Sequence, residues 1–104
     1  MAKPTIEEAL AYLGIDEVDD LVTRNLTRAL DTAYKYMLGA VGDDVEDYLP
    51  ADPRTTELTL IYADDLYTNR GVSAKVSGAT RRLIAGMVTQ LQLELRAAKE
   101  GVGA

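Results

Sequence analysis

The sequence predicts an all-α domain, a single small helical bundle of three main helices preceded by a short N-terminal helix. Apolar residues recur at helical spacing over three long segments, and capping residues stand at the ends of these segments. The glycines mostly mark the helix ends rather than a nucleotide-binding loop. At 104 residues the chain is long enough for one domain and too short for two. We therefore treat residues 1–104 as one domain with an ordered core at 5–98.

A short helix is predicted after a loose end at residues 1–4. Thr5 suits the N-cap, and Glu8 follows three residues later, which is the spacing of a capping box. Gly14 then ends the helix near Leu13.

The longest helix is predicted at about residues 18–41, with Asp16 or Asp19 as its N-cap. Its polar side carries Thr23, Arg24, Thr27, Arg28, Asp31 and Lys35. Its apolar stripe consists of Val18, Leu21, Val22, Leu26, Ala29, Leu30, Ala33, Met37 and Leu38. Ordering this many backbone residues costs more than the stripe alone returns, so the stripe must pack on another helix.

The segment between this helix and Pro53 is predicted to form a loop with a single turn at about 45–49. Gly39 and Gly42 interrupt the helical pattern, and Pro50 and Pro53 keep the residues before them extended. Four carboxylates lie in this loop: Asp43, Asp44, Glu46 and Asp47.

The third helix is predicted at residues 52–71. Asp52 suits the N-cap and Pro53 suits the first helical position, where a missing N–H costs nothing. The apolar stripe consists of Leu58, Ile61, Tyr62 and Leu66, while Asp64, Thr68 and Arg70 lie on the other side. Asn69, Arg70 and Gly71 supply a cationic last turn and a glycine stop.

Residues 72–78 alternate in polarity and fit either an extended arm or a turn. The last helix is predicted from about Ala79 to Lys99, and residues 100–104 are predicted to be loose. Its apolar side carries Leu83, Ile84, Met87, Val88, Leu91, Leu95 and Ala98.

The composition limits the compartment and the chemistry of the protein. Six tyrosines take the place of Phe and Trp, which are both absent, so the aromatic side chains should lie at the edge of the core with their hydroxyls reaching water. Because Cys is absent, a reducing cytoplasm is the natural compartment, and we expect neither a signal peptide nor a membrane span.

No catalytic, cofactor or metal site is predicted. Without His and Cys the chain lacks the residues of zinc sites and of Cys-His or Ser-His nucleophiles. The carboxylates at 43–47 lack the order of a calcium-binding loop, so a solvated loop is favoured. Asp64 and Asp65 would form a catalytic pair only inside a pocket, and adjacent helical residues diverge. We therefore do not expect an enzyme.

Charge is distributed unevenly along the chain. Residues 1–52 carry four basic and twelve acidic side chains, whereas residues 53–104 carry seven basic and five acidic ones. The net charge of −6 predicts poor affinity for DNA phosphates. The basic cluster consists of Arg70, Lys75, Arg81 and Arg82, and it is either a solvated helix start or a docking site for an acidic neighbour. Arginines in a first turn oppose the helix dipole, which favours docking.

Residues 52–71 resemble the corresponding helix of the small phage head-tail connector proteins, the adaptors beneath the portal. The shared features are a loop ending in Asp-Pro, an apolar and aromatic stripe, and a Tyr-x-Asn-Arg type ending, here residues 67–70. The helix and acidic turn that begin at Thr5, and the long helix at 18–41, extend the resemblance over residues 5–96. The chain departs from the family pattern at residues 36–42, which lack the usual basic residue, and at 78–80, which lack the usual proline.

The resemblance implies a structural virion protein at the head-tail junction, present in the host cytoplasm during assembly. About twelve copies would form a ring below the portal and above a stopper or tail-completion protein, with DNA passing through without specific binding. The alternative that the sequence leaves open is a small helical regulator or an antitoxin-like interaction protein. The candidate subunit or portal interface comprises Arg70, Lys75, Arg81, Arg82, Asp43, Asp44, Glu46 and Asp47.

Overall fold

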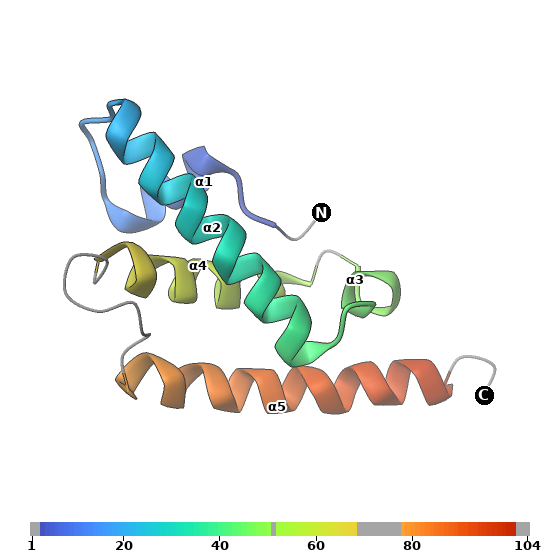
Figure 1. Cartoon of the computed structure of the whole chain (residues 1–104). Coiled ribbons are helices and arrows are strands. Elements are labelled where there is room, and N and C mark those ends of the chain that lie inside the picture. Colours follow the sequence, from blue (N-terminus) through green and yellow to red (C-terminus); the bar gives the residue numbers. More distant parts are fainter. Residues whose placement is uncertain (1–2, 51, 69–77, 102–104) are drawn as a thin grey trace.

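α4 (Pro53–Thr68) is the central helix, and the other long helices pack against it (Figure 1). The computed structural model describes residues 3–50, 52–68 and 78–101, and every regular element in these ranges is a helix. The others are α1 (Ile6–Leu13), α2 (Asp20–Val41), α3 (Val45–Tyr48) and α5 (Gly78–Gly101). The all-α class and the three long helices with a short N-terminal one are therefore confirmed, and α3 is the single turn predicted in the acidic loop.

The helix ends confirm most of the predicted caps. The Glu8 N–H donates to Thr5 Oγ1 at 3.1 Å and the Thr5 N–H donates to Glu8 Oε1 at 3.0 Å, which completes the capping box. Gly14 ends α1 at a φ of 73°, a conformation that glycine adopts without strain. Asp19, rather than Asp16, caps α2 and accepts the Val22 N–H at 2.8 Å.

α4 begins as predicted, because Pro53 is its first residue and the Asp52 carboxylate accepts the Arg54 N–H at 2.9 Å. The predicted ending at residues 69–71 lies outside the described residues. Residues 72–77, for which the sequence fits either an extended arm or a turn, also lie outside the described residues. The described chain resumes at Gly78, the first residue of α5, which continues past Lys99 to Gly101.

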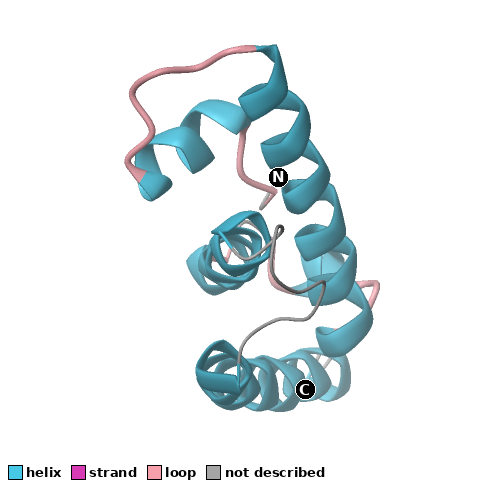
Figure 2. Ribbon diagram, turned by 60° about the vertical axis from the view of Figure 1, so that its left-hand side comes forward, coloured by secondary structure: helices cyan, strands magenta, loops and turns pink. Residues whose placement is uncertain are grey.

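Two side-chain clusters form the core, and α2 and α4 contribute to both. The first cluster joins α1, α2 and α4 through Ala9, Leu26, Ala29, Leu30, Ala33, Leu60 and Ala63. The second joins α2, α3, α4 and α5 through Met37, Val41, Val45, Leu58, Ile84, Leu91 and Leu95. α2 crosses α4 and reaches α5 with its C-terminal end, while α4 and α5 run antiparallel (Figures 1 and 2).

α4 is buried over more of its surface than its predicted stripe implies. Thr55, Thr59 and Ala63 are fully buried, and Leu58 and Leu60 are buried as well. Thr55 Oγ1 donates to the Asp52 carbonyl at 2.7 Å, and Thr59 Oγ1 donates to the Thr55 carbonyl at 2.9 Å. Because both hydroxyls have partners, their burial leaves no unsatisfied donor.

Two predictions for the start of the long helix are wrong. Val18 and Leu21 were placed in the packed stripe of the long helix, but their side chains are 48% and 60% exposed, because the first turns of α2 extend beyond α4 (Figure 1). α2 itself begins at Asp20 rather than near Val18. The end predicted as loose is partly held: Pro4 is buried, and Lys3 Nζ lies 2.6 Å from Asp31 Oδ1 of α2.

The six tyrosines lie at the edge of the core, as predicted. None is fully buried, and Tyr62 packs against both clusters. Its ring stacks on that of Tyr36, with centroids 4.3 Å apart and planes 15° from parallel. The Tyr34 hydroxyl donates a hydrogen bond to the Glu46 carboxylate. The aromatic residues therefore join α2 to α4 and to the acidic loop.

Candidate functional site

The predicted basic cluster is described only at its second half. Arg81 and Arg82 are exposed on the first turn of α5, whereas Arg70 and Lys75 lie outside the described residues. Burial raises the pKa of the nearby Tyr62 hydroxyl, and the positive charge of Arg81 acts in the opposite direction. We call Arg81 and Arg82 the basic pole.

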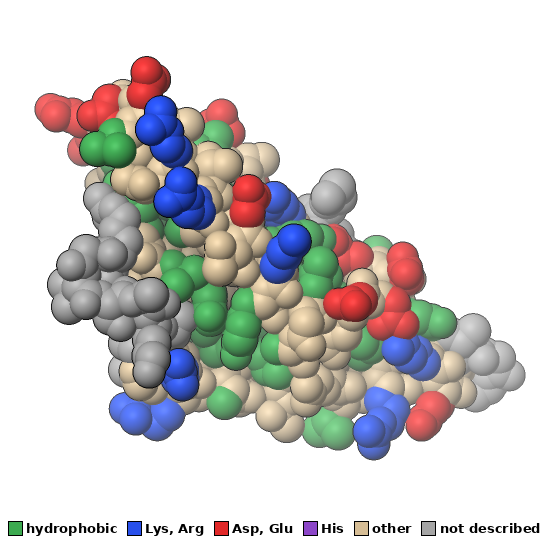
Figure 3. Space-filling model, in the orientation of Figure 1, with side chains coloured by type: hydrophobic (Ala, Val, Ile, Leu, Met, Phe, Trp, Pro, Cys, Tyr) green, Lys and Arg blue, Asp and Glu red, His purple; other side chains and the backbone are tan. Residues whose placement is uncertain are grey.

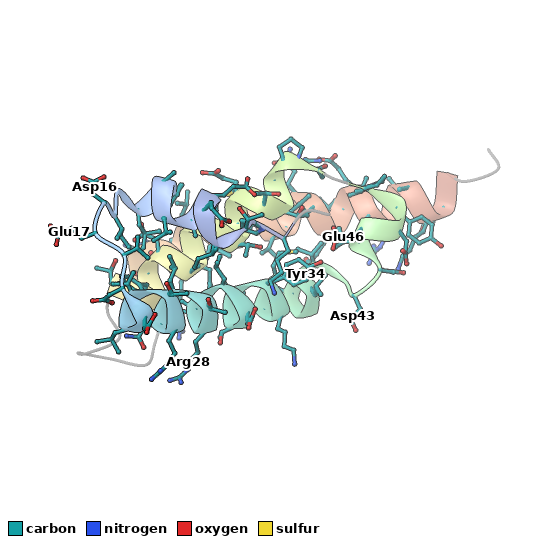
Figure 4. All side chains as sticks on the ribbon, turned by 90° about the horizontal axis from the view of Figure 1, so that it is seen from above. Asp16, Glu17, Arg28, Tyr34, Asp43 and Glu46 are labelled. Carbon is teal, nitrogen blue, oxygen red and sulfur yellow. The ribbon has the colours of Figure 1, made fainter. Side chains whose placement is uncertain are left out.

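The four predicted acidic residues remain together around α3, and we call Asp43, Asp44, Glu46 and Asp47 the acidic pole. Asp44 Oδ2 lies 2.7 Å from Lys99 Nζ, and the hydrogen bond from Lys99 lowers the pKa of the Asp44 carboxyl. Glu46 accepts the Tyr34 hydroxyl, and Asp43 points away from the bundle (Figure 4). Two members thus attach the loop to α5 and α2, while Asp43 and Asp47 are exposed.

The two poles lie at opposite ends of α5. The basic pole is in its first turn, and the acidic pole is attached at Lys99, 17 to 18 positions later in the sequence. At about 1.5 Å per residue this separation is about 26 Å. The poles therefore face different surroundings and do not neutralise each other.

An ion-pair network that sequence reasoning missed connects α4 to α5. Arg54 Nη2 lies 2.7 Å from Asp52 Oδ2 and 2.8 Å from Glu94 Oε1. The Arg54 guanidinium donates hydrogen bonds to Glu94 and to Asp52; these bonds raise the pKa of Arg54, the bond to Glu94 most, and lower the pKa of both carboxyls. Asp52 was identified as a cap, but Glu94 is forty residues from Arg54 and no local pattern connects them.

Arg54→Gln should lower the free energy of unfolding near neutral pH, and the difference from the unaltered protein should shrink in acid. The folded-state pKa values of Asp52 and Glu94 lie below their unfolded values, so their contribution is present above about pH 4 and is lost as pH falls through the folded-state values. Urea unfolding of both proteins at about pH 7 and about pH 3 measures this. The exposed Arg96→Gln is the control. A stability difference that does not change with pH would contradict the prediction.

A groove of about 490 Å³ lies along one side of α4, between α1 and α5. Tyr12 and Leu83 form its two flanks and Ile61 lies on α4 between them. Partial burial raises the pKa of the Tyr12 hydroxyl, with further contributions from the charges of Glu57 and Asp64. The lining residues are Tyr12, Glu57, Ile61, Asp64, Asp65, Thr68, Thr80 and Leu83, and we call this site the α4 groove.

The groove combines apolar and acidic side chains. Leu83 was placed in the packed stripe of the last helix, but it is 55% exposed because it flanks the groove instead of entering the core. Asp64 accepts a hydrogen bond from Thr68 Oγ1 at 3.0 Å. Such a lining suits an apolar surface that carries positive charge.

The described residues contain no group of three or more acidic side chains arranged to hold a metal ion. Within the described ranges, no helix has the length and apolarity that crossing a membrane requires. Comparisons with protein-family models, curated proteins and solved structures find no significant match. The resemblance to head-tail connectors therefore stays a prediction.

Proposed function

We propose that this chain is a head-tail connector subunit, a structural virion protein that forms a ring under the portal at the virion neck. The observation that supports it best is the placement of the basic and acidic poles about 26 Å apart at opposite ends of α5. A subunit between two different partners needs two different ends, one for the portal above and one for a stopper or tail-completion protein below.

The charge supports passage of DNA without specific binding. Each chain carries −6, so a ring of about twelve copies would carry about −72 and repel phosphates from its wall. The proposal includes no catalytic step, no cofactor and no membrane contact. DNA would move through the ring during completion of packaging and during ejection.

Electron microscopy of the purified protein, alone and with its cognate portal, tests this function directly. We expect rings on the portal and no shift of duplex DNA in a gel. A tight symmetric dimer that binds duplex DNA strongly would contradict the proposal and favour the regulator.

Arg81→Glu with Arg82→Glu should weaken portal docking about tenfold while helical circular dichroism is retained. Both side chains are exposed, and carboxylates in a first turn agree with the helix dipole, so the substitution should not destabilise α5. Equilibrium binding to the portal at low and moderate salt measures the loss.

The matched control is Arg81→Lys with Arg82→Lys, which keeps the charge and should keep most of the binding. If the Glu variant binds the portal as well as the unaltered protein does, the basic pole has no role in docking.

A further inference from the structure

Among the residues that the structure describes, α1, α2 and α5 pack against α4 and leave one side of it open. Ala63 packs in the same cluster as the buried residues of α2, and Leu58 packs with Ile84 of α5. At 100° per residue, Glu57, Ile61 and Asp64 lie on the side of α4 opposite the buried Thr59. That open side is the α4 groove, so it faces away from the side on which α2 packs. Seen from above, α2 forms one side of the molecule and α1 and α5 lie toward the other (Figure 4).

The solvent side of α2 has the opposite character to the groove. Lys and Arg side chains follow the line of α2 on the face drawn in Figure 3. They lie opposite the buried side of the helix, and Figure 4 shows Arg28 pointing away from the bundle. Asp31 shares this side but is paired with Lys3. We call Leu21, Arg24, Arg28 and Lys35 the α2 outer face, and all four are exposed.

The charges on the two surfaces match in spacing as well as in sign. Arg28 and Lys35 are seven residues apart on α2, and Glu57 and Asp64 are seven residues apart on α4. Both pairs therefore span two helical turns, about 10.5 Å, so two cation-carboxylate contacts can form at once between helices packed side by side. Leu21, which is 60% exposed, and Leu83, which is 55% exposed, supply apolar area at the two surfaces.

We propose that the α2 outer face of one copy docks into the α4 groove of the next copy and forms the lateral contact of the ring. This inference rests on the proposed function. Because the two surfaces lie on opposite sides of the subunit, the contact is head-to-tail and extends beyond a dimer, which a self-complementary contact does not. The poles at the ends of α5 stay available for the partners above and below.

Charge reversal on each surface tests the pairing. One variant is Arg28→Glu with Lys35→Glu, and the other is Glu57→Lys with Asp64→Lys. Each variant alone presents like charges on its two surfaces and should associate at least tenfold more weakly than the unaltered protein. The quadruple variant and a 1:1 mixture of the two double variants restore opposite charges and should restore assembly larger than a dimer. Sedimentation velocity measures free assembly, and native mass spectrometry measures the copies bound to the portal.

The control is Arg96→Glu, an exposed residue of α5 outside both surfaces, which should leave assembly unchanged. Circular dichroism confirms that each variant is folded. The lateral contact is wrong if either double variant assembles as well as the unaltered protein does. It is also wrong if the variants are folded but neither the mixture nor the quadruple variant recovers assembly. If groove reversal blocks a different protein partner while self-assembly persists, that partner occupies the groove and the inference is wrong.

The unaltered protein distinguishes failure of this inference from failure of the proposed function. If it forms rings on the portal while the reversals have no effect, the connector function stands and the lateral contact lies elsewhere. If it forms no multimeric assembly with or without the portal, both proposals fail.

Discussion

Leu91→Ala should lower the free energy of unfolding by about 2–5 kcal/mol. Leu91 is 0% exposed and belongs to the cluster through which α5 contacts α2, α3 and α4. Removing its side chain leaves a cavity at the junction of these helices, and a small domain has only about 5–15 kcal/mol in total. Urea unfolding followed by far-UV circular dichroism measures the loss.

Leu93→Ala is the matched control, because it makes the same chemical change two residues away on the same helix. Leu93 is 61% exposed, so its removal should change stability by no more than about 0.5 kcal/mol. Equal effects at both positions would mean that α5 is not anchored through this cluster. Because the groove and both poles involve α5, loosening this helix should also weaken portal docking.

Local rules predicted the helices well because helix ends depend on neighbouring residues. The Thr5 capping box, the Gly14 stop and the Pro53 start each need only three or four residues to form. Between Asp16 and Asp19 the sequence left the choice open, and the structure selects Asp19. Hydrophobic periodicity likewise identified Leu26 and Leu91 as core residues.

The exposure of individual stripe residues was harder to predict, because periodicity gives one face of a helix but not the neighbour that covers it. Leu21 and Leu83 have helical spacing that matches their buried neighbours, but both side chains are exposed, and no helix within the described part of the chain covers them. Thr55 and Thr59 are polar but buried, and their burial is not penalised because their hydroxyls donate to carbonyls of the same segment. These assignments depend on how α2, α4 and α5 cross.

The sequence identified the charged segments of the candidate site but not how they are arranged in space. The acidic run and Arg81-Arg82 were both identified, but their separation along α5 required the contact between Lys99 and Asp44. The α4 groove joins residues from 12 to 83 and has no sequence motif. Its one early signal was the pair Asp64 and Asp65, which was considered for catalysis and lines the groove instead.

Gly42→Ala should destabilise the protein by about 1–3 kcal/mol. Gly42 joins α2 to α3 with a φ of 148°, a conformation that side chains with a Cβ rarely adopt. Its N–H donates to the Leu38 carbonyl at 2.8 Å and its carbonyl accepts the Val45 N–H at 3.0 Å, so the turn cannot relax without losing hydrogen bonds. An added Cβ would also lie 2.6 Å from Leu95 Cδ2 in the core.

Gly39→Ala is the control, with the opposite expected sign. Gly39 lies inside α2 with no atom near the position of an added Cβ, so alanine should raise stability by about 0.5–1 kcal/mol through helix propensity. The double variant Gly42→Ala with Leu95→Ala should cost less than the sum of the two single changes, because the colliding methyl group is gone. If the stability loss of the double variant equals the sum of the two single losses, Gly42→Ala destabilises the protein through backbone strain alone and not through contact with Leu95.

The turn at Gly42 leads into the acidic pole, so displacing it should also weaken binding of the partner at that end. Binding assays on the same set of variants measure this effect.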